Sequence, residues 1–265
     1  MKDTNLPSVS ILGSRVHLLS VAAAADRCIE FARCRNGRCR QVIVTGFHGL
    51  WEAHKNPHLH RVLNAADLWV PDGIAPVWIA RLRGHRNVAR VPGAELMDAF
   101  FTRADKAGLA SYFYGENEPT LAALRAALEK KYPGHRVAGT FSPPFRPLTD
   151  AEEAEHVQMI NDSGADALWL GLGLPKQDLW IARNLHRLRV PLAVGVGAAF
   201  RFLAGTVKRS PALIGNLGLE WLWRLAHEPR KCWRRCCVDG PGFVWCVSLE
   251  MTGIKRYHQD SGRQT

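Results

Sequence analysis

Long apolar runs are absent from this sequence of 265 residues. No window reaches the roughly 18 apolar residues that a membrane-spanning helix needs. The opening MKDTNLPSVSILGSR also lacks the uninterrupted apolar stretch of a signal peptide. We therefore expect a cytoplasmic protein whose contact with a membrane, if any, is peripheral.

Cysteine patterns that indicate a disulfide framework or a zinc site are missing as well. The seven cysteines form no pair of CxxC motifs. Cys232, Cys236 and Cys237 crowd one basic stretch, but no histidine follows at zinc-finger spacing. Reduced thiols are the favoured interpretation, and we expect no metal site.

The glycine motifs of two large nucleotide-binding classes are not present either. GLGLPK and GVGAAF have Lys176 and Phe200 where the GxGxxG fingerprint needs its third glycine. No GxxxxGK[ST] segment occurs. These absences disfavour a Rossmann dehydrogenase and an ATPase, and no cofactor is predicted.

Positive charge is abundant. The chain has 35 lysines and arginines against 24 acidic residues, which gives a formal net charge of +11. This excess favours an anionic partner. Nucleic acid, an acidic membrane and a phosphorylated substrate all fit, and the sign of the charge alone does not choose among them.

Short β-rich apolar runs alternate with helical patterns, which is typical of an α/β fold with a parallel sheet between helices. Several runs are apolar throughout, as expected when helices cover both faces. Helices should begin after Ser20, at Pro57, and at 150, where Thr149 and Glu152 form a capping box. The predicted strands span 41–45, 67–71, 110–115, 136–141, 166–171 and 191–196.

The composition changes after about residue 208. From there to 256 the pattern is helical only and holds four of the nine tryptophans. In EWLWRLAHEPRKCWRR (220–235), five cations are offset by two glutamates. A charge run is usually a solvated face, but tryptophans among the cations need burial or an interface. We interpret 1–208 as an α/β domain and 209–265 as a basic helical appendage with a frayed tail.

Glycines and polar residues follow the predicted strands. Ligands of open parallel sheets bind beyond the carboxyl ends of the strands, so these are the candidate binding residues. Glycine-rich ends can also bring backbone N–H groups against phosphate. The candidates are Thr45 and His48 after the first strand, Asp72 after the second, Gly115 after the third, and Gly171, Gly173 and Gln177 after the fifth.

Several of these residues have an ordinary structural alternative. From spacing alone, Asp72 is better explained as the N-cap of a helix that begins near Ile74. Gln177 could be a polar residue in the first turn of a helix over 176–189. His48 belongs to a group of histidines without metal-ligand spacing on one helix face, which favours solvated surface positions.

Seven segments, taken in order, resemble the WecG/TagA/CpsF glycosyltransferases (glycosyltransferase family 26). Each alone is weak, but the ordered set is specific and covers about residues 9–250. The segments are VTGFHGL, LNAADLWVPDGIAPVW, FYGENEPT, YPGHRVAGTFSPPF, GLGLPKQDLWIA, GVGAAFRFLAGTVKRSP and LGLEWLWRLAHEPRKCWRR.

The resemblance implies a Rossmann-like domain and metal-independent, inverting transfer from a UDP-sugar to a polyprenyl-diphosphate-linked sugar. It makes Asp72 the catalytic base and places Thr45 and Gln177 in the active site. Inverting transfer needs one carboxylate to accept the proton of the acceptor hydroxyl, and positive charge to hold the departing UDP, so the physical chemistry agrees.

The resemblance also implies that the appendage closes over the site and touches the membrane. Arg224, Lys231 and Arg234 match the family's basic positions at the diphosphate. Guanidinium groups are suited to a diphosphate where no metal is present. Self-association into a homo-oligomer is a further implication.

Three residues depart from the family pattern. Phe47 stands where asparagine is common, Arg201 where aspartate often follows GVGAAF, and Lys231 where arginine is common. Lysine offers a point charge in place of a bidentate fork. We expect these differences to affect the identity of the sugars more than the class of reaction.

Two other functions compete with the transferase. The basic, tryptophan-rich tail is compatible with a cytoplasmic nucleic-acid-binding protein. However, the cations concentrate outside a domain whose strand ends suit a small ligand, so we expect no nucleic-acid partner. An inactive membrane scaffold is the third possibility, and the intact Asp72 and Gln177 argue against it.

Overall fold

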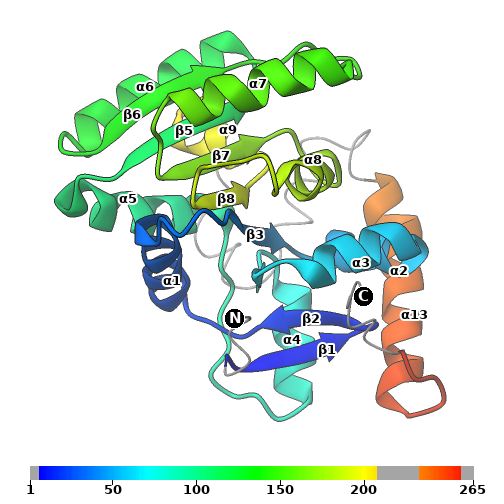
Figure 1. Cartoon of the computed structure of the whole chain (residues 1–265). Coiled ribbons are helices and arrows are strands. Elements are labelled where there is room, and N and C mark those ends of the chain that lie inside the picture. Colours follow the sequence, from blue (N-terminus) through cyan, green and yellow to red (C-terminus); the bar gives the residue numbers. More distant parts are fainter. Residues whose placement is uncertain (1–5, 208–232, 258–265) are drawn as a thin grey trace.

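The computed structural model describes residues 6–207 and 233–257. A parallel sheet of six strands forms the centre, in the order β4-β3-β8-β7-β5-β6, with helices on both faces (Figure 1). This confirms the Rossmann-like α/β prediction, and all six predicted strands are present. They are β3 (Arg40–Thr45), β4 (Leu68–Pro71), β5 (Ala110–Gly115), β6 (Arg136–Phe141), β7 (Ala167–Gly171) and β8 (Leu192–Gly195).

An antiparallel hairpin that the sequence did not predict precedes the sheet. It consists of β1 (Ser8–Ile11) and β2 (Ser14–His17). Leu12 and Gly13 form its turn, both at positive φ, as in the primed turns that join two strands with two residues. The His17 ring accepts a hydrogen bond from the backbone nitrogen of Trp69 in β4 at 3.0 Å, which ties the hairpin to the sheet.

Local capping sets the starts of the helices, as the sequence predicted. The Ser20 side chain accepts a hydrogen bond from Ala23, Asn56 caps the helix that begins at Pro57, and Thr149 and Glu152 form the capping box. The helices of the first 203 residues are α1 (Val21–Arg33), α2 (Phe47–Lys55), α3 (Pro57–Ala65), α4 (Ile74–Leu82), α5 (Gly93–Ala107), α6 (Glu118–Lys131), α7 (Asp150–Asp162), α8 (Lys176–Asn184) and α9 (Ala199–Leu203).

One predicted boundary was wrong. The helix expected over 176–189 ends at Asn184. The Asn184 side chain donates to Glu153 Oε1 at 2.6 Å and to the Trp180 carbonyl at 3.0 Å. The bond to Glu153 ties the last turn of α8 to α7, and after it the chain turns back toward β8.

Alternate residues of the strands point to opposite faces, and each face has its own core. Trp169 and Val194 pack with α1, α5, α6 and α9 on one face. On the other face, Leu168 and Leu170 pack with α7 and α8. A third cluster at the β3–β4 end joins the hairpin to α2, α3 and α4. The strands β3, β4, β5, β7 and β8 are thus buried on both faces, which explains their largely apolar sequences, whereas the edge strand β6 is only partly buried.

Residues 233–257, the described part of the predicted appendage and called the C-terminal segment below, continue this third cluster. A π-helical turn, η1 (Arg235–Asp239), leads into α13 (Gly240–Met251), which stands beside α2 in Figure 1. Phe243 and Val247 of α13 are buried in the cluster. Within the described ranges, no helix is long and apolar enough to cross a membrane.

Candidate active site

Asp72 and Thr45 meet at the carboxyl edge of the sheet. β3 and β4 are parallel neighbours, with Thr45 in register with Pro71. The backbone N–H of Asp72 donates to the Thr45 carbonyl at 3.2 Å, so the pairing of the two strands places Asp72 directly beside the end of β3. The Thr45 side chain is buried against the first turn of α2, while Asp72 is exposed. The topology therefore joins two residues that the sequence could only place after separate strands.

The Asp72 carboxylate does not cap α4. The N-cap of that helix is Gly73, and no side chain bonds to the helix start. Instead, Asp72 Oδ1 accepts a hydrogen bond at 3.3 Å from the backbone N–H of Gly93, the first residue of α5. The structural alternative for Asp72 was therefore wrong. An exposed carboxylate held at the sheet edge by a backbone donor is suited to accept a proton from a bound ligand.

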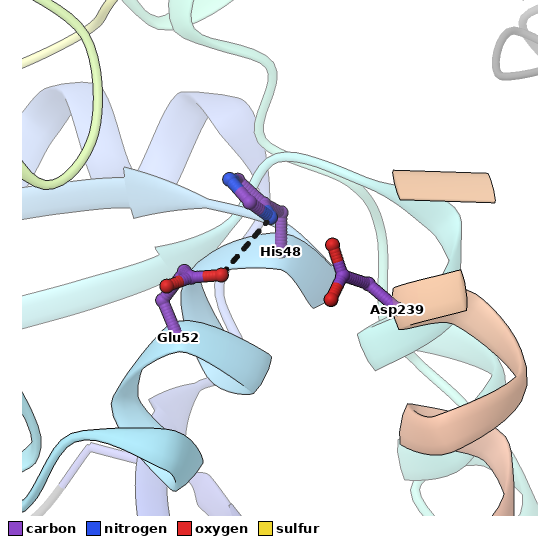
Figure 2. Close-up of side chains that lie close together, drawn as sticks. All are labelled: His48, Glu52 and Asp239. Atoms are coloured by element: carbon purple, nitrogen blue, oxygen red, sulfur yellow. Dashed lines mark ion pairs between the residues drawn. The ribbon is translucent and has the colours of Figure 1, made fainter. Parts of the chain in front are cut away.

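His48 lies in the first turn of α2, next to the same edge. Burial and the nearby positive charge of Arg235 lower the pKa of its ring to about 4, so the imidazole is neutral at physiological pH. Its Nδ1 lies 3.9 Å from Glu52 Oε1, and Asp239 approaches from the start of α13 (Figure 2). One histidine and two carboxylates with ligand atoms within 4.8 Å could hold a metal ion.

Lys55 already forms ion pairs with the two carboxylates of this group. Lys55 Nζ lies 2.7 Å from Glu52 Oε1 and 3.4 Å from Asp239 Oδ1. Asp239 also accepts a hydrogen bond from Trp51 Nε1 at 2.9 Å. A divalent ion would have to displace the ammonium group, so we interpret the group as the joint between α2 and the C-terminal segment.

The candidate glycines line the other half of the edge. Gly115 ends β5 with a φ of 121°, a conformation open to glycine, and a Cβ there would lie 2.7 Å from the carbonyl carbon of Gly171. Gly171 ends β7, and Gly173 follows with a φ of 78°. These positions bring the loops after β5 and β7 into close contact at the edge.

Gln177 connects two of these loops from below the surface. Its side chain is 2% exposed. Its Oε1 accepts the backbone N–H of Gly197 at 2.9 Å and that of Gly173 at 3.2 Å. These two donors are therefore used internally. Gln177 positions the ends of β7 and β8, and its buried side chain does not face the open edge as a pocket-lining residue would.

Asp178, beside Gln177, is a fully buried carboxyl group. Burial raises its pKa to about 7. The side chains of Gln177 and Asp178 press on Gly195, because a Cβ on that glycine would lie 2.7 Å from Gln177 Nε2 and 2.8 Å from Asp178 Oδ1. A glycine at the end of β8 is thus required for the first turn of α8 to fit.

Replacing Gln177 by alanine should weaken both the fold and catalysis. The two partly buried N–H groups of Gly173 and Gly197 would lose their acceptor, at a cost of roughly 1–3 kcal/mol each where water does not replace it. We expect a lower melting temperature together with reduced turnover. Gln177→Glu, which keeps an acceptor oxygen, should retain more of the melting temperature than Gln177→Ala. Normal stability of the alanine variant would contradict the connecting role.

The basic residues predicted at the diphosphate are only partly described. Arg224 and Lys231 lie outside the described residues. Arg234 is exposed immediately before η1. The next residue, Arg235, lies close enough to His48 to lower the pKa of that ring. The C-terminal segment therefore brings positive charge to the end of β3.

Residues that the sequence analysis did not select also shape the site. Gly93 holds Asp72, Asp239 joins α13 to α2, and Glu116 pairs with Arg201 at the end of β5. Each contact joins segments more than 20 residues apart. Only Glu116 carried a local signal, since it directly follows a predicted strand.

A surface cavity of about 490 Å³ opens between α1, α5 and α9. The described residues that line it include the carboxylates Glu95 and Asp98 but no lysine or arginine. A diphosphate would find no countercharge in this lining, so we do not place it there.

Comparison with known proteins identifies the family of the chain. Residues 9–257 match the model of the glycosyl transferase WecG/TagA/CpsF family. The chain is also 31% identical over 197 residues to an N-acetylglucosaminyldiphosphoundecaprenol N-acetyl-beta-D-mannosaminyltransferase of Bacillus spizizenii, a match that covers 74% of each protein. The chain therefore belongs to the WecG/TagA/CpsF family and is a glycosyltransferase.

Proposed function

We propose that this enzyme moves a sugar from a UDP-sugar to a sugar carried on a polyprenyl diphosphate, with inversion and without a metal ion. The Bacillus relative is named for transfer to N-acetylglucosaminyldiphosphoundecaprenol, which supports an acceptor of this class. The proposal depends on the position of Asp72, whose exposed carboxylate lies at the carboxyl edge of the sheet. Product analysis with a panel of UDP-sugars and lipid-linked acceptors tests it, and no transfer from any UDP-sugar would contradict it.

Asp72 would act as the general base. Its exposed carboxylate can accept the proton of an acceptor hydroxyl as that oxygen attacks the anomeric carbon of the donor. The bond between that carbon and the UDP oxygen breaks, and UDP leaves from the opposite face. The Gly93 N–H occupies one lone pair of the carboxylate and fixes its orientation.

Positive side chains would stabilise the departing UDP. Arg224, Lys231 and Arg234 are the candidates from the family motifs, and Arg235 is an additional cation close to His48. A neutral His48 does not repel these cations. Because charge develops on the leaving diphosphate, oriented cations at this position lower the barrier more than they strengthen ground-state binding.

A peripheral contact with an anionic membrane would bring the enzyme to its lipid-linked acceptor. Val244 and Trp245 of α13 are 62% and 65% exposed, and Trp233 is 54% exposed. Tryptophan is favoured where an apolar region meets water. Nearby cations would add attraction to anionic lipid of about 1 kcal/mol each. This arrangement supports a cytoplasmic enzyme on the inner membrane face, and a homo-oligomer remains compatible with it.

Transfer activity should survive EDTA. The sequence has no acidic pair of the DxD type at a strand end, and Lys55 already pairs with the carboxylates of Glu52 and Asp239. Initial rates with and without chelator, followed by addition of Mg²⁺ or Mn²⁺, measure this directly. Loss of activity with EDTA and its return with metal would contradict the metal-independent mechanism.

A further inference from the structure

Arg201 lies at the carboxyl edge of the sheet on α9, the short helix that follows β8. Its Nε donates to Glu116 Oε1 at 2.8 Å. The Glu116 side chain is 7% exposed, whereas the Arg201 side chain is 44% exposed. The carboxylate is thus built into the protein and the guanidinium faces outward. One edge of the guanidinium is fixed by the glutamate, which leaves its orientation defined.

The backbone at the end of β5 is specialised to make this pair. Gly115 and Glu116 both have positive φ, 121° and 57°. A non-glycine residue rarely adopts this conformation, which costs about 1–2 kcal/mol. The Glu116 carbonyl accepts a hydrogen bond from Ser142 Oγ at 2.6 Å, and its N–H donates to the Gly171 carbonyl. These contacts hold Glu116 in a conformation that turns its side chain toward Arg201.

Three backbone donors at this part of the edge are bonded within the protein. The N–H groups of Gly173 and Gly197 both donate to Gln177, and that of Glu116 donates to Gly171. A nucleotide at the ends of β5, β7 and β8 could not use these three donors, so a side chain that offers N–H groups there gains importance. A guanidinium can present several N–H groups in a planar fork, which suits phosphate and carbonyl oxygens.

We propose that Arg201, oriented by Glu116, contacts the nucleoside diphosphate part of the donor. The inference rests on the proposed nucleotide-sugar donor and adds a positioning pair to it. Arg201 supplies the contact, and Glu116 sets the direction of the fork. The contact lies on the β5–β8 side of the edge, whereas Asp72 lies on the β3–β4 side. The nucleotide would accordingly extend along the edge, with its sugar toward Asp72.

A purely structural role makes a different prediction. If Arg201 only neutralises the buried Glu116, replacing both residues leaves no unpaired buried charge. The double variant should then recover both its stability and its affinity for UDP. The informative variants are Arg201→Gln, Glu116→Gln and the two combined. The matched control is Arg183→Gln. Arg183 also pairs with a buried glutamate, Glu153, at 3.1 Å, but near the C-terminal end of α8 and away from the edge of the sheet where Arg201 lies.

Calorimetric binding of UDP, UMP and uridine to the full chain, with melting temperatures, tests the proposal. We expect Arg201→Gln to weaken UDP binding by about 10- to 100-fold, the loss typical of one charged hydrogen bond. The double variant should regain melting temperature but not UDP affinity. Glu116→Gln should weaken binding less, and Arg183→Gln should leave it unchanged. A greater loss for UDP than for uridine assigns the contact to phosphate, and an equal loss assigns it to the nucleoside.

Two results would overturn the contact. One is unchanged UDP affinity in a folded Arg201→Gln variant, and the other is a double variant that regains both stability and affinity. In either case wild-type binding of UDP would leave the proposed donor intact. Wild-type protein without affinity for UDP would instead overturn the proposed donor and this contact together.

Discussion

Asp72→Asn is expected to keep the fold and the affinity for UDP while lowering turnover by about 100-fold or more. The amide oxygen of asparagine can still accept the hydrogen bond from Gly93 that fixes Asp72. The amide cannot accept a proton from the acceptor hydroxyl at neutral pH. The substitution therefore removes the chemistry of the base and preserves the local geometry.

Steady-state turnover, UDP binding and melting temperature of the purified variant separate these effects. Asp162→Asn is a suitable control, because Asp162 is also an exposed carboxylate but lies at the end of α7, where it pairs with Arg189. It should leave all three quantities near the wild-type values. Turnover close to wild type in a folded Asp72→Asn variant would require a different base.

The sheet could be predicted from the sequence because its information is local. QVIVT and DALWLG contain the uninterrupted apolar runs VIV and ALWL, as expected of buried parallel strands. Helix starts at Ser20, Pro57 and Asp150 likewise follow from side chains within three residues. The same alternation of strands and helices places Thr45 and Asp72 at strand ends, and the pairing of β3 with β4 makes them neighbours.

The hairpin and the role of Gln177 depend on distant contacts. The two strands of the hairpin have four residues each, too few for a clear alternation, and are fixed by packing on β4. Gln177 resembles any polar residue in a first helical turn until β8 brings Gly197 against it. Asp72 shows the reverse case, since its short-range spacing favoured an N-cap and its tertiary partner is Gly93. Contacts between segments that are distant in the sequence decide all three positions.

A chain that ends at Lys208 is expected to lose almost all transferase activity and its binding to anionic liposomes. Because the sequence pattern assigns 1–208 to a separate α/β domain, this domain would be expected to fold without the appendage. The contacts of α13 change this expectation. Phe243 packs against Phe47 with tilted rings whose centroids lie 5.7 Å apart, and Glu250 pairs with Arg83 at 2.6 Å. Truncation would expose the cluster that joins the hairpin to α2, so the melting temperature should fall as well.

Substitutions that keep α13 packed separate activity and membrane binding from stability. Val244→Ser with Trp245→Ser changes two exposed side chains, and Arg234→Gln with Arg235→Gln removes two charges before and within η1. We expect both double variants to melt near the wild-type temperature. The first should sediment poorly with anionic liposomes yet retain transfer to a water-soluble acceptor analogue. The second should lose transfer to the same analogue, because the leaving diphosphate would lose countercharge.

Salt distinguishes the two contributions to membrane binding. Attraction between cations and anionic lipid is screened as ionic strength rises, whereas burial of Trp245 in the membrane interface is not weakened in this way. Liposome binding of the wild type should therefore decrease with salt, and that of the arginine variant should start lower and change less. If a chain ending at Lys208 kept full activity and full liposome binding, the C-terminal segment would be neither a lid nor an anchor. If the variant with Val244→Ser and Trp245→Ser kept its liposome binding and the arginine variant lost it, these two apolar side chains would not be the anchor. The electrostatic role of Arg234 and Arg235 would then stand.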